Sequence, residues 1–536
     1  MSNDKNKEIE RRRTFAIISH PDAGKTTLTE KFLLYGGAIN LAGSVKGKKT
    51  AKHAVSDWME IEKQRGISVT SSVMQFEYDG YCVNILDTPG HEDFSEDTYR
   101  TLMAADSAVM VIDASKGVEK QTIKLFKVCV LRHIPIFTFI NKMDRQSKDP
   151  FELLDNIESI LGISTCPMNW PIGSGKEFKG VYDRGTKEVN MFTAEMNGQK
   201  EVNTWNVPID DPTIDDQIGD YFREKLEEDM ELLEGAGSEF DLDEVRAGNL
   251  TPVFFGSALT NFGVETFLQH FLKMTESPAS RESNLRVIEP EEEDFSAFVF
   301  KIQANMNKAH RDRIAFIRIV SGEFDAGMEA WHVQSNKKVK LSQPTQIMAS
   351  ERQIVDKAYA GDIIGIFDPG TFAIGDTLCS SKDKFAFEGI PTFPPEHFAR
   401  VKQLDTMKRK QFVKGITQIA QEGAVQIFQE YITGMEEIIV GAVGTLQFDV
   451  LKFRLASEYN VYIGLEQLPY EYIRYISNQD EFDPDSINGT SDMKKIRDLK
   501  GNVLLLFVHE WSIRMVQERN KGLELSEFGT GGLKRE

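Results

Sequence analysis

Cysteine is scarce in this chain of 536 residues, which holds 4 of them. They are widely separated, and no two form a CxxC pair (Cys82, Cys129, Cys166 and Cys379). A scaffold of disulfides is therefore excluded. Isolated thiols of this kind are typical of a reducing compartment.

Long apolar runs are missing as well. No stretch of about 18 apolar residues marks a transmembrane helix. Residues 1–15 are charged where a secretory signal would be apolar. We therefore expect a cytoplasmic protein without a membrane partner.

Positive charge is in deficit, because 63 Lys and Arg stand against 83 Asp and Glu and the net charge is −20. This disfavours a protein that grips nucleic acid with its whole surface, and no DNA partner is expected. Apolar residues still make up 40% of the chain, enough for several cores. At ~150 residues per domain, the length predicts three to four domains.

The first part of the chain alternates short apolar runs, at 15–19, 81–87, 107–113 and 134–140, with helical stretches at 24–34 and 118–131. This alternation predicts a doubly wound, mostly parallel α/β sheet. A further strand at 251–255 and a helix at 263–274 come much later. We therefore predict a first domain at residues 1–280, with an insertion at about 165–250.

The rest of the chain changes pattern twice. An acidic linker at 281–294 is followed by short alternating strands with glycine turns, which predict an antiparallel β-barrel domain at 295–388. Pro391, Pro394 and Pro395 mark the next boundary. Predicted helices at 403–422 and 444–458, mixed with strands, indicate a C-terminal α+β domain at 391–536.

A phosphate-binding loop is indicated directly after the first predicted strand. Residues 19–26 read SHPDAGKT and nearly match GxxxxGK[ST], although Ser19 replaces the first glycine. Gly24 lets the backbone approach phosphate at the head of a helix, Lys25 supplies an ammonium group, and Thr26 can ligate Mg²⁺. A chance AGKT turn is the alternative. The predicted phosphate-binding residues are Ser19, His20, Pro21, Asp22, Ala23, Gly24, Lys25, Thr26 and Thr27.

A second block, DTPGH, ends the buried strand at 81–87. Asp87 lies where open α/β sheets bind ligands and can hold a Mg²⁺-bound water. Gly90 can turn its N–H toward a γ-phosphate and lose that bond on hydrolysis, as a switch does. An ordinary strand-ending turn is the alternative. The block comprises Asp87, Thr88, Pro89, Gly90 and His91.

A third block follows the strand at 134–140 and reads NKMD, comprising Asn141, Lys142, Met143 and Asp144. The Asp144 carboxylate can accept hydrogen bonds from guanine N1–H and N2–H₂, and Asn141 can reach the other edge of the base. Adenine would leave these acceptors unpaired. Ser257 and Ala258, after the last strand, can complete the pocket. The three blocks together predict GTP rather than ATP.

The blocks SHPDAGKTT, QRGIS, DTPGHEDF, NKMDR and GSAL resemble the translational GTPases, the superfamily of elongation factors Tu and G. The resemblance covers the first domain and the barrel, where AHRDRIAFIRIVSG looks like the superfamily's second domain. It implies binding of GTP and GDP with Mg²⁺. It also implies that His91 positions the attacking water once ribosomal RNA orders this side chain. Lys25 is the second predicted catalytic residue, because its ammonium group can offset the charge that develops on the phosphates. A histidine that only packs its helix is the alternative.

One segment departs from the superfamily. Its first switch usually reads RGIT, whose threonine ligates Mg²⁺, whereas this chain has Arg65-Gly66-Ile67-Ser68. Ser68 is therefore the predicted ligand, beside Thr26 and Asp87, and Thr70 is a competing candidate. Arg65 could be nominated as an arginine finger, but an exposed structural arginine is the favoured interpretation.

Over its whole length the chain resembles the termination branch of the superfamily. MNWPIG, FPPEHFARV, QEGAVQIF and VGAVGTLQFDVLKFRL carry this resemblance, at 168–173, 393–401, 421–428 and 440–455. It implies a monomeric, ribosome-dependent GTPase that drives class I release factors off the ribosome after peptide release. The alternatives are a sulfate-activating GTPase subunit, a GTP-sensing ribosome binder without turnover, and a translocase-like or ribosome-protection factor.

Because the resemblance implies a ribosome as partner, the distribution of charge along the chain indicates which segments could contact it. Residues 201–250 hold 16 acids and 3 bases, whereas residues 391–420 hold 6 bases and 2 acids. The second segment, and the cluster of Lys308, Arg311, Arg313 and Arg318, are candidate contacts to ribosomal RNA or ordinary solvated faces. The acidic insertion is a candidate contact for a basic ribosomal protein.

Overall fold

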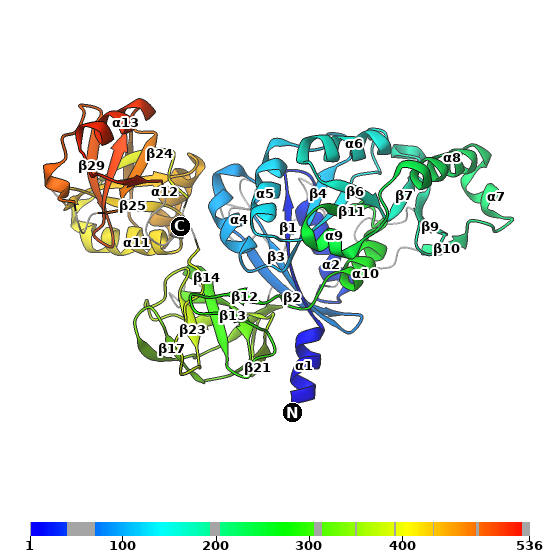
Figure 1. The fold of residues 1–536 in the computed structure, drawn as a ribbon, viewed down its shortest axis with the longest axis horizontal. Helices are drawn as coiled ribbons and strands as arrows, with labels where there is room; N and C mark the ends of the chain where they lie inside the picture. Colours follow the sequence, from blue (N-terminus) through cyan, green and yellow to red (C-terminus); the bar gives the residue numbers. More distant parts are fainter. Residues whose placement is uncertain are drawn as a thin grey trace.

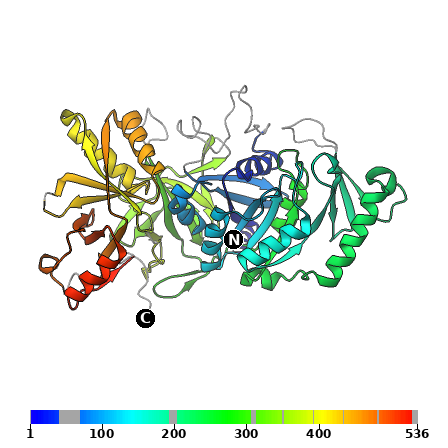
Figure 2. The same ribbon diagram turned by 90° about the horizontal axis from the view of Figure 1, so that it is seen from above.

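The computed structural model describes residues 2–39, 70–192, 204–304, 313–348, 351–390, 393–432, 434–478 and 482–527. Figure 1 shows an α/β domain at the centre and right, a barrel domain of antiparallel strands below it, and a C-terminal domain at the upper left. Seen from above in Figure 2, the C-terminal domain and the long helix of the α/β domain's insertion lie at opposite ends of the molecule.

The α/β domain is built on a seven-stranded sheet with the order β2-β3-β1-β4-β5-β11-β6. Its neighbouring strands are parallel except for β2 and β3, which are antiparallel. The strands are β1 (Arg12–Ser19), β2 (Ser72–Tyr78), β3 (Tyr81–Asp87), β4 (Ser107–Asp113), β5 (Ile136–Asn141), β6 (Ser164–Pro167) and β11 (Leu250–Phe255). Because β1 lies between β3 and β4, the loop after β1 stands where ligands bind in open α/β sheets.

Helices cover both faces of this sheet, which explains its nearly continuous apolar strands. On one face, α4 (Ser95–Leu102), α5 (Lys120–Leu131) and α6 (Pro150–Leu161) contribute Leu102, Leu125 and Leu153 to a shared core. On the other, α2 (Lys25–Tyr35) and α10 (Val264–Met274) meet where the rings of Phe32 and Phe267 stack 5.9 Å apart. The core therefore holds the sheet edge that carries the candidate site rigidly.

A smaller sheet with the order β10-β9-β8-β7 lies between β6 and β11 in the sequence. The pieces of this segment are β7 (Asn169–Ile172), η2 (Gly175–Glu177), β8 (Gly180–Asp183), β9 (Glu188–Phe192), β10 (Thr204–Pro208), α7 (Ile214–Ile218), α8 (Asp220–Ala236) and α9 (Leu242–Ala247). The acidic helix α8 lies at the far right of Figure 1. The acidity noted in the sequence therefore lies far from the C-terminal domain.

The barrel domain has an eight-stranded antiparallel sheet with the order β18-β17-β23-β14-β15-β22-β19-β20. Its strands are β14 (Ser296–Ala304), β15 (Arg313–Ser321), β17 (Glu329–His332), β18 (Lys337–Lys340), β19 (Thr345–Met348), β20 (Glu351–Ile354), β22 (Ile363–Phe367) and β23 (Thr377–Cys379). Two short ribbons join it: β12 (Arg281–Glu282) with β13 (Val287–Ile288), and β16 (Glu323–Asp325) with β21 (Lys357–Tyr359).

The C-terminal domain is an eight-stranded sheet, β27-β24-β26-β25-β29-β30-β28-β31, with three helices among its described residues. Its elements are β24 (His397–Gln403), η3 (Thr406–Lys408), α11 (Arg409–Gln421), β25 (Gln426–Glu430), β26 (Gly434–Ala442), α12 (Leu446–Tyr459), β27 (Ile463–Leu468), β28 (Tyr472–Ile476), η4 (Pro484–Ser486), β29 (Met493–Asp498), β30 (Val503–Phe507), α13 (Glu510–Arg519) and β31 (Leu525–Ser526). The expected fold class, a mostly parallel α/β sheet followed by an antiparallel barrel and an α+β domain, is confirmed.

Two helix starts differ from the prediction. The helix expected from residue 403 begins at Arg409, because residues up to Gln403 pair with β27 and the Asp405 side chain then opens η3 by accepting from Met407 N–H. The helix expected from residue 444 begins at Leu446. Local periodicity could not separate these starts from the strand and turn before them.

Two arginines of the cluster that we interpreted as candidate RNA contacts or an ordinary solvated face are buried instead. Arg318 donates to Asp106 of the α/β domain over 2.6 Å. Arg313 donates to Asp368 over 2.6 Å and also to Gln421 of the C-terminal domain. A buried guanidinium needs a carboxylate partner, so the interpretation is wrong for these two. Lys308 and Arg311 lie outside the described residues.

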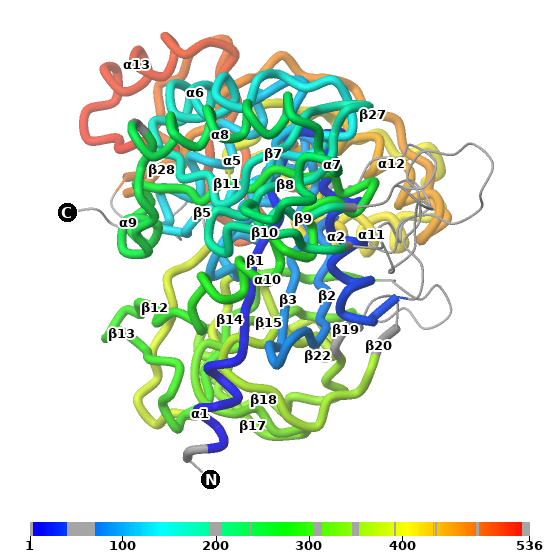
Figure 3. Tube along the Cα trace, turned by 90° about the vertical axis from the view of Figure 1, so that its right-hand side faces the viewer, coloured from blue at the N-terminus to red at the C-terminus, as the bar shows by residue number. Residues whose placement is uncertain are grey.

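The α/β and barrel domains share a buried polar network. Arg12 donates to Asp362 over 2.8 Å, and the same carboxylate accepts from the side chain of Gln75 at 3.0 Å. The N-terminal helix α1 (Ser2–Glu10) extends this interface, because Lys5 donates to the backbone carbonyls of Glu291 and Glu292. Figure 3 shows α1 running from β1 down to the barrel. Within the described ranges, no helix combines the length and the apolar character needed to cross a membrane.

This network predicts a large stability cost for Asp362→Ala, because the substitution removes the buried carboxylate that accepts from both Arg12 and Gln75 and leaves the buried Arg12 with Glu8, whose side chain is 34% exposed. We expect a loss of about 3–5 kcal/mol in the free energy of unfolding, measured by equilibrium urea denaturation. Asp325→Ala removes a carboxylate from an exposed ion pair with Lys357 and should change that free energy by less than about 1 kcal/mol. Equal effects of the two substitutions would contradict the assigned role of Asp362.

Candidate functional site

The loop between β1 and α2 has the backbone that a phosphate-binding loop needs. Gly24 is the N-cap of α2 with a φ of 100°, and Asp22 also has a positive φ, of 65°. A Cβ on Gly24 would lie 2.2 Å from Asn141 Nδ2, so a side chain is excluded there by both conformation and space. The free N–H groups at the start of α2 are available to an anion.

The first two sequence blocks meet at one buried ion pair. Lys25 Nζ contacts Asp87 Oδ1, and both side chains are buried. Thr29 Oγ1 lies 3.4 Å from the same carboxylate oxygen. The ammonium predicted to serve phosphates and the carboxylate predicted to serve a metal-bound water therefore occupy adjacent positions.

The other residues of the second block lie next to β1 and the phosphate-binding loop. Thr88 donates to the carbonyl of Ile17 in β1 over 2.7 Å. A Cβ placed on Gly90 would lie 3.5 Å from Pro21 Cα, so the backbone at Gly90 faces the loop. His91 is 38% exposed in its side chain, and its Nδ1 lies 3.3 Å from the backbone nitrogen of Asp93.

Asn141 joins three loops through its amide. Nδ2 donates to the carbonyl of Ala23 over 2.9 Å. Oδ1 accepts from the backbone N–H groups of Lys142 at 2.9 Å and Ala258 at 2.8 Å. We predicted that Asn141 reaches the base. In the structure its amide connects the phosphate loop to the two loops that follow β5 and β11.

Lys142 and Asp144 complete the third block. Lys142 has a φ of 73°, and its Nζ lies 2.5 Å from the carbonyl of Asp22 and 2.5 Å from Asp113 Oδ2. Asp144 Oδ1 accepts from the hydroxyl of Ser257 over 2.5 Å. Met143 is buried below them. The carboxylate, the lysine stem and the loop after β11 thus line one corner of the site.

Sequence reasoning missed two acidic residues here. Asp113 ends β4 and pairs with Lys142. Burial alone would raise the pKa of Asp113, but hydrogen bonds from Lys142 and Ser115 outweigh it and hold that pKa below its ordinary value. Glu119 Oε1 lies 3.4 Å from His20 Nε2. The signal for Asp113 was present, since like Asp87 it is a carboxylate at the end of a parallel strand.

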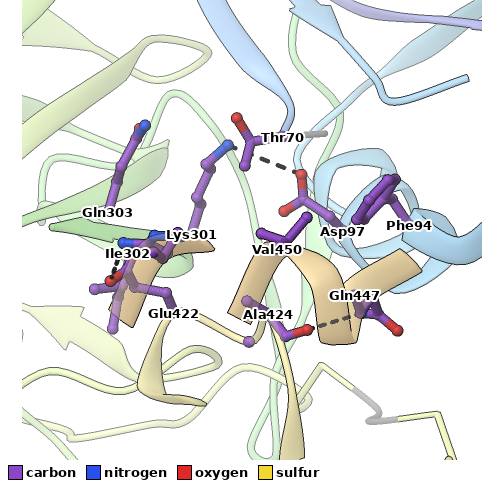
Figure 4. A pocket seen from close by; sticks show the side chains of 12 residues that line it. Thr70, Phe94, Asp97, Lys301, Ile302, Gln303, Glu422, Ala424, Gln447 and Val450 are labelled. Carbon is purple, nitrogen blue, oxygen red and sulfur yellow. Dashed lines mark hydrogen bonds and ion pairs between the residues drawn. The ribbon is translucent and has the colours of Figure 1, made fainter. Parts of the chain in front are cut away.

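The candidates for the first switch are only partly placed. Ser68 and Arg65 lie outside the described residues. Thr70 lines a cavity of about 40 Å³ between the three domains, with Phe94, Asp97, Lys301 and Gln447 (Figure 4). The next residue, Ser71, accepts from Lys301 Nζ through its hydroxyl at 2.9 Å. The end of the first switch is therefore attached to the barrel domain.

The donor set beside the phosphate loop suits Mg²⁺. This hard cation takes oxygen ligands and keeps several waters. The hydroxyl of Thr26, at the start of α2, and the carboxylate of Asp87, at the end of β3, are oxygen donors of this kind. Asp87 is tied to Lys25 on the same side of the loop. These residues fit the ion that the sequence predicts.

Three family matches cover most of the chain. Residues 10–277 match the family described as Elongation factor Tu GTP binding domain. Residues 294–381 match Elongation factor G domain 2, and residues 387–517 match Class II release factor RF3, C-terminal domain. The C-terminal match separates this chain from the sulfate-activating and translocase-like alternatives.

Relatives that match nearly the whole chain agree with these family matches. Peptide chain release factor 3 of Symbiobacterium thermophilum is 60% identical over 96% of this chain and 97% of that protein. The proteins of the same name from Gloeobacter violaceus and Listeria innocua are 52% and 54% identical, over 97% and 98% of this chain and 98% and 100% of those proteins. A solved structure from Thermus thermophilus has a TM-score of 0.69 at 20% identity, covers 92% of this chain and 71% of its own, and shows the fold alone.

The domain matches, the relatives and the fold agree on one assignment. The chain binds guanine nucleotides and hydrolyses GTP as a factor of translation termination. It belongs to the peptide chain release factor 3 family of translational GTPases.

Proposed function

We propose that the loop after β1 holds the phosphates of GTP. The binding residues are Ser19 to Thr27, with Lys25 beside the β- and γ-phosphates. The left-handed backbone at Gly24 and the exposed N–H groups at the start of α2 support this assignment. On binding, the Lys25 ammonium exchanges its contact with Asp87 for phosphate oxygens.

In the same proposal Thr26 would ligate Mg²⁺ directly, Asp87 would hold it through water, and Ser68 would be the ligand from the first switch. When bound, the ion neutralises charge on the phosphates. Thr26 and Asp87 are supported by their positions at the loop. Ser68 rests on the sequence alone, and Thr70, which lines the cavity between the domains, is the competing candidate.

Guanine is read by Asp144. Its carboxylate is oriented by the Ser257 hydroxyl, and the polar head of Lys142 is fixed by Asp22 and Asp113. Asn141, Met143 and Ala258 form the floor of the pocket for the base. A base that cannot donate to Asp144 leaves this carboxylate desolvated and unpaired, which disfavours adenine.

Hydrolysis is phosphoryl transfer to water. Lys25 and the loop amides stabilise the developing charge, and His91 orients the water. The backbone at Gly90 faces the phosphate loop at Pro21, which supports a position of the following histidine next to the γ-phosphate. A half-exposed imidazole in this place can be reached by ribosomal RNA.

The family supports the biological role that we propose. The factor works in the cytoplasm as a monomer, binds ribosomes that carry a class I release factor after peptide release, and stimulates dissociation of that factor. GTP and GDP forms differ in the order of the switches, and the ribosome binds one form better. Lys410 and Lys414, both on α11, are candidate contacts to ribosomal RNA, and the acidic helix α8 is a candidate contact to a ribosomal protein.

His91→Ala should abolish ribosome-stimulated hydrolysis, because no side chain then orients the water. We expect the stimulated rate to fall by at least ~10²-fold, while GTP affinity stays within about twofold of wild type. The measurement is phosphate release with purified ribosomes. His509→Ala, the same change at an exposed histidine of the C-terminal domain, is the control. A wild-type stimulated rate in His91→Ala would refute the assignment.

Asp144→Asn should weaken guanine nucleotides and admit xanthine nucleotides, since an amide N–H replaces an acceptor that faces N1–H. We expect roughly a 10²-fold loss of GDP affinity, which corresponds to ~3 kcal/mol, measured by titration of a fluorescent analogue. Asp155→Asn, at an exposed position of α6, is the matched control. Unchanged GDP affinity in Asp144→Asn would show that another group reads the base.

The role in termination is tested on ribosomes stopped at a stop codon after peptide release, with a labelled class I release factor bound. Addition of this protein with GTP should accelerate dissociation of the label. Protein without nucleotide is the control. Dissociation at the unaided rate would overturn the proposed role while leaving the GTPase assignment intact.

A further inference from the structure

The segment that carries His91 is also the segment on which the C-terminal domain docks. It consists of His91, η1 (Glu92–Phe94) and α4. Asp93 Oδ2 accepts from the backbone N–H of Leu446 over 2.7 Å. Arg100 donates to the carbonyl of Gly423, and the rings of Tyr99 and Phe393 lie 5.0 Å apart. Figure 4 shows Phe94 and Asp97 of this segment facing Val450 and Gln447 of α12.

Helix α12 takes part of its N-terminal cap from the other domain. Its own N-cap residue, Thr445, makes no capping hydrogen bond with its side chain. The Gln447 side chain accepts from the N–H groups of Val443 and Gly444 instead. The N–H of Leu446 is left for Asp93. A carboxylate at this end is favoured by both the free N–H and the helix dipole.

The fit between Asp93 and α12 is close. A Cβ on Gly444 would lie 2.1 Å from Asp93 Cγ, so the carboxylate packs directly against this glycine. Gly444 has no positive φ, which means that glycine is required by the contact and not by the backbone conformation. The Asp93 side chain is 14% exposed. Its position is therefore set by the docked C-terminal domain.

The same residue engages one nitrogen of His91. The backbone N–H of Asp93 donates to His91 Nδ1 over 3.3 Å, and Asp93 Oδ1 lies 3.3 Å from the same nitrogen. Because Nδ1 accepts from the Asp93 N–H, the proton of the neutral imidazole lies on Nε2, and this hydrogen bond fixes the ring orientation. Here the nitrogen left to face a water is Nε2.

We propose that Asp93 is a positioning residue that couples the docking of the C-terminal domain to the orientation of His91. The Asp93 carboxylate holds α12, and the backbone N–H of the same residue holds the imidazole through Nδ1. When the C-terminal domain moves away, the Leu446 N–H leaves, the turn that presents the Asp93 N–H is released and His91 loses its fixed orientation. This inference rests on the proposed role of His91 in orienting water.

The test weakens the contact from both sides. Asp93→Asn removes the negative charge that the N-terminus of α12 favours, and Gly444→Ala adds a methyl group where Asp93 lies. Glu92→Gln is the matched control, because Glu92 belongs to the same η1 turn, is 60% exposed and pairs with Lys124 of its own domain. Amide exchange at Leu446 reports whether the contact is broken, and nucleotide affinity and thermal melting report that the fold is intact.

Ribosome-stimulated hydrolysis is measured across ribosome concentrations. Both contact variants should lower the maximal rate by roughly tenfold, the size of effect expected from a lost orienting group. The half-saturating ribosome concentration should stay within about twofold. Glu92→Gln should behave as wild type. A purely structural cap would change amide exchange at Leu446 and leave the maximal rate unchanged, which would overturn the coupling.

A second comparison separates this inference from the role of His91. Because Asp93 acts through His91, adding Asp93→Asn to His91→Ala should slow hydrolysis no further. Wild-type maximal rates in both contact variants, with His91→Ala slow, would overturn the coupling and leave the proposed function standing. Slowing by Asp93→Asn but not by Gly444→Ala would overturn the link to the C-terminal domain. A wild-type rate in His91→Ala would instead overturn the proposed function.

Discussion

The buried amide of Asn141 is the interaction on which the candidate site depends. It donates to the loop after β1 and accepts from the loops after β5 and β11, so three segments that are far apart in the sequence are connected by one side chain. A buried polar group left without partners costs about 1–3 kcal/mol. The three loops are therefore held in place together or released together. Gly24 completes the constraint, because only a residue without Cβ fits beside this amide.

The domains are attached to this core in different ways. The barrel domain is held by buried ion pairs, Arg12 with Asp362 and Arg318 with Asp106, which tolerate little displacement. The C-terminal domain is attached to the segment after DTPG by single hydrogen bonds and ring contacts. The barrel therefore behaves as part of the nucleotide-binding body. With GTP bound as proposed, the C-terminal domain can respond to changes at the γ-phosphate.

Features that depend on a local chemical requirement could be predicted, since buried parallel strands read as continuous apolar runs and a phosphate loop needs glycine and a following helix. Features that depend on a distant partner could not. The helix expected from residue 403 begins at Arg409 because β24 pairs with β27, which lies about 60 residues further on. Arg313 and Arg318 read as exposed bases, yet they are buried because carboxylates from other segments neutralise them. The charge of a segment indicates a surface only when its partners are known.

The sequence by itself determined the chemistry of this protein: the phosphate loop, the DTPGH and NKMD blocks and their order along an α/β sheet. These depend on short-range rules of backbone conformation and residue type, which a single segment can satisfy alone. Only the tertiary structure decided how the blocks are held together and which segment carries the C-terminal domain. Asn141 with Ala258 and Asp93 with Leu446 are contacts between distant segments. Their partners are selected by packing, and packing is a property of the folded chain as a whole.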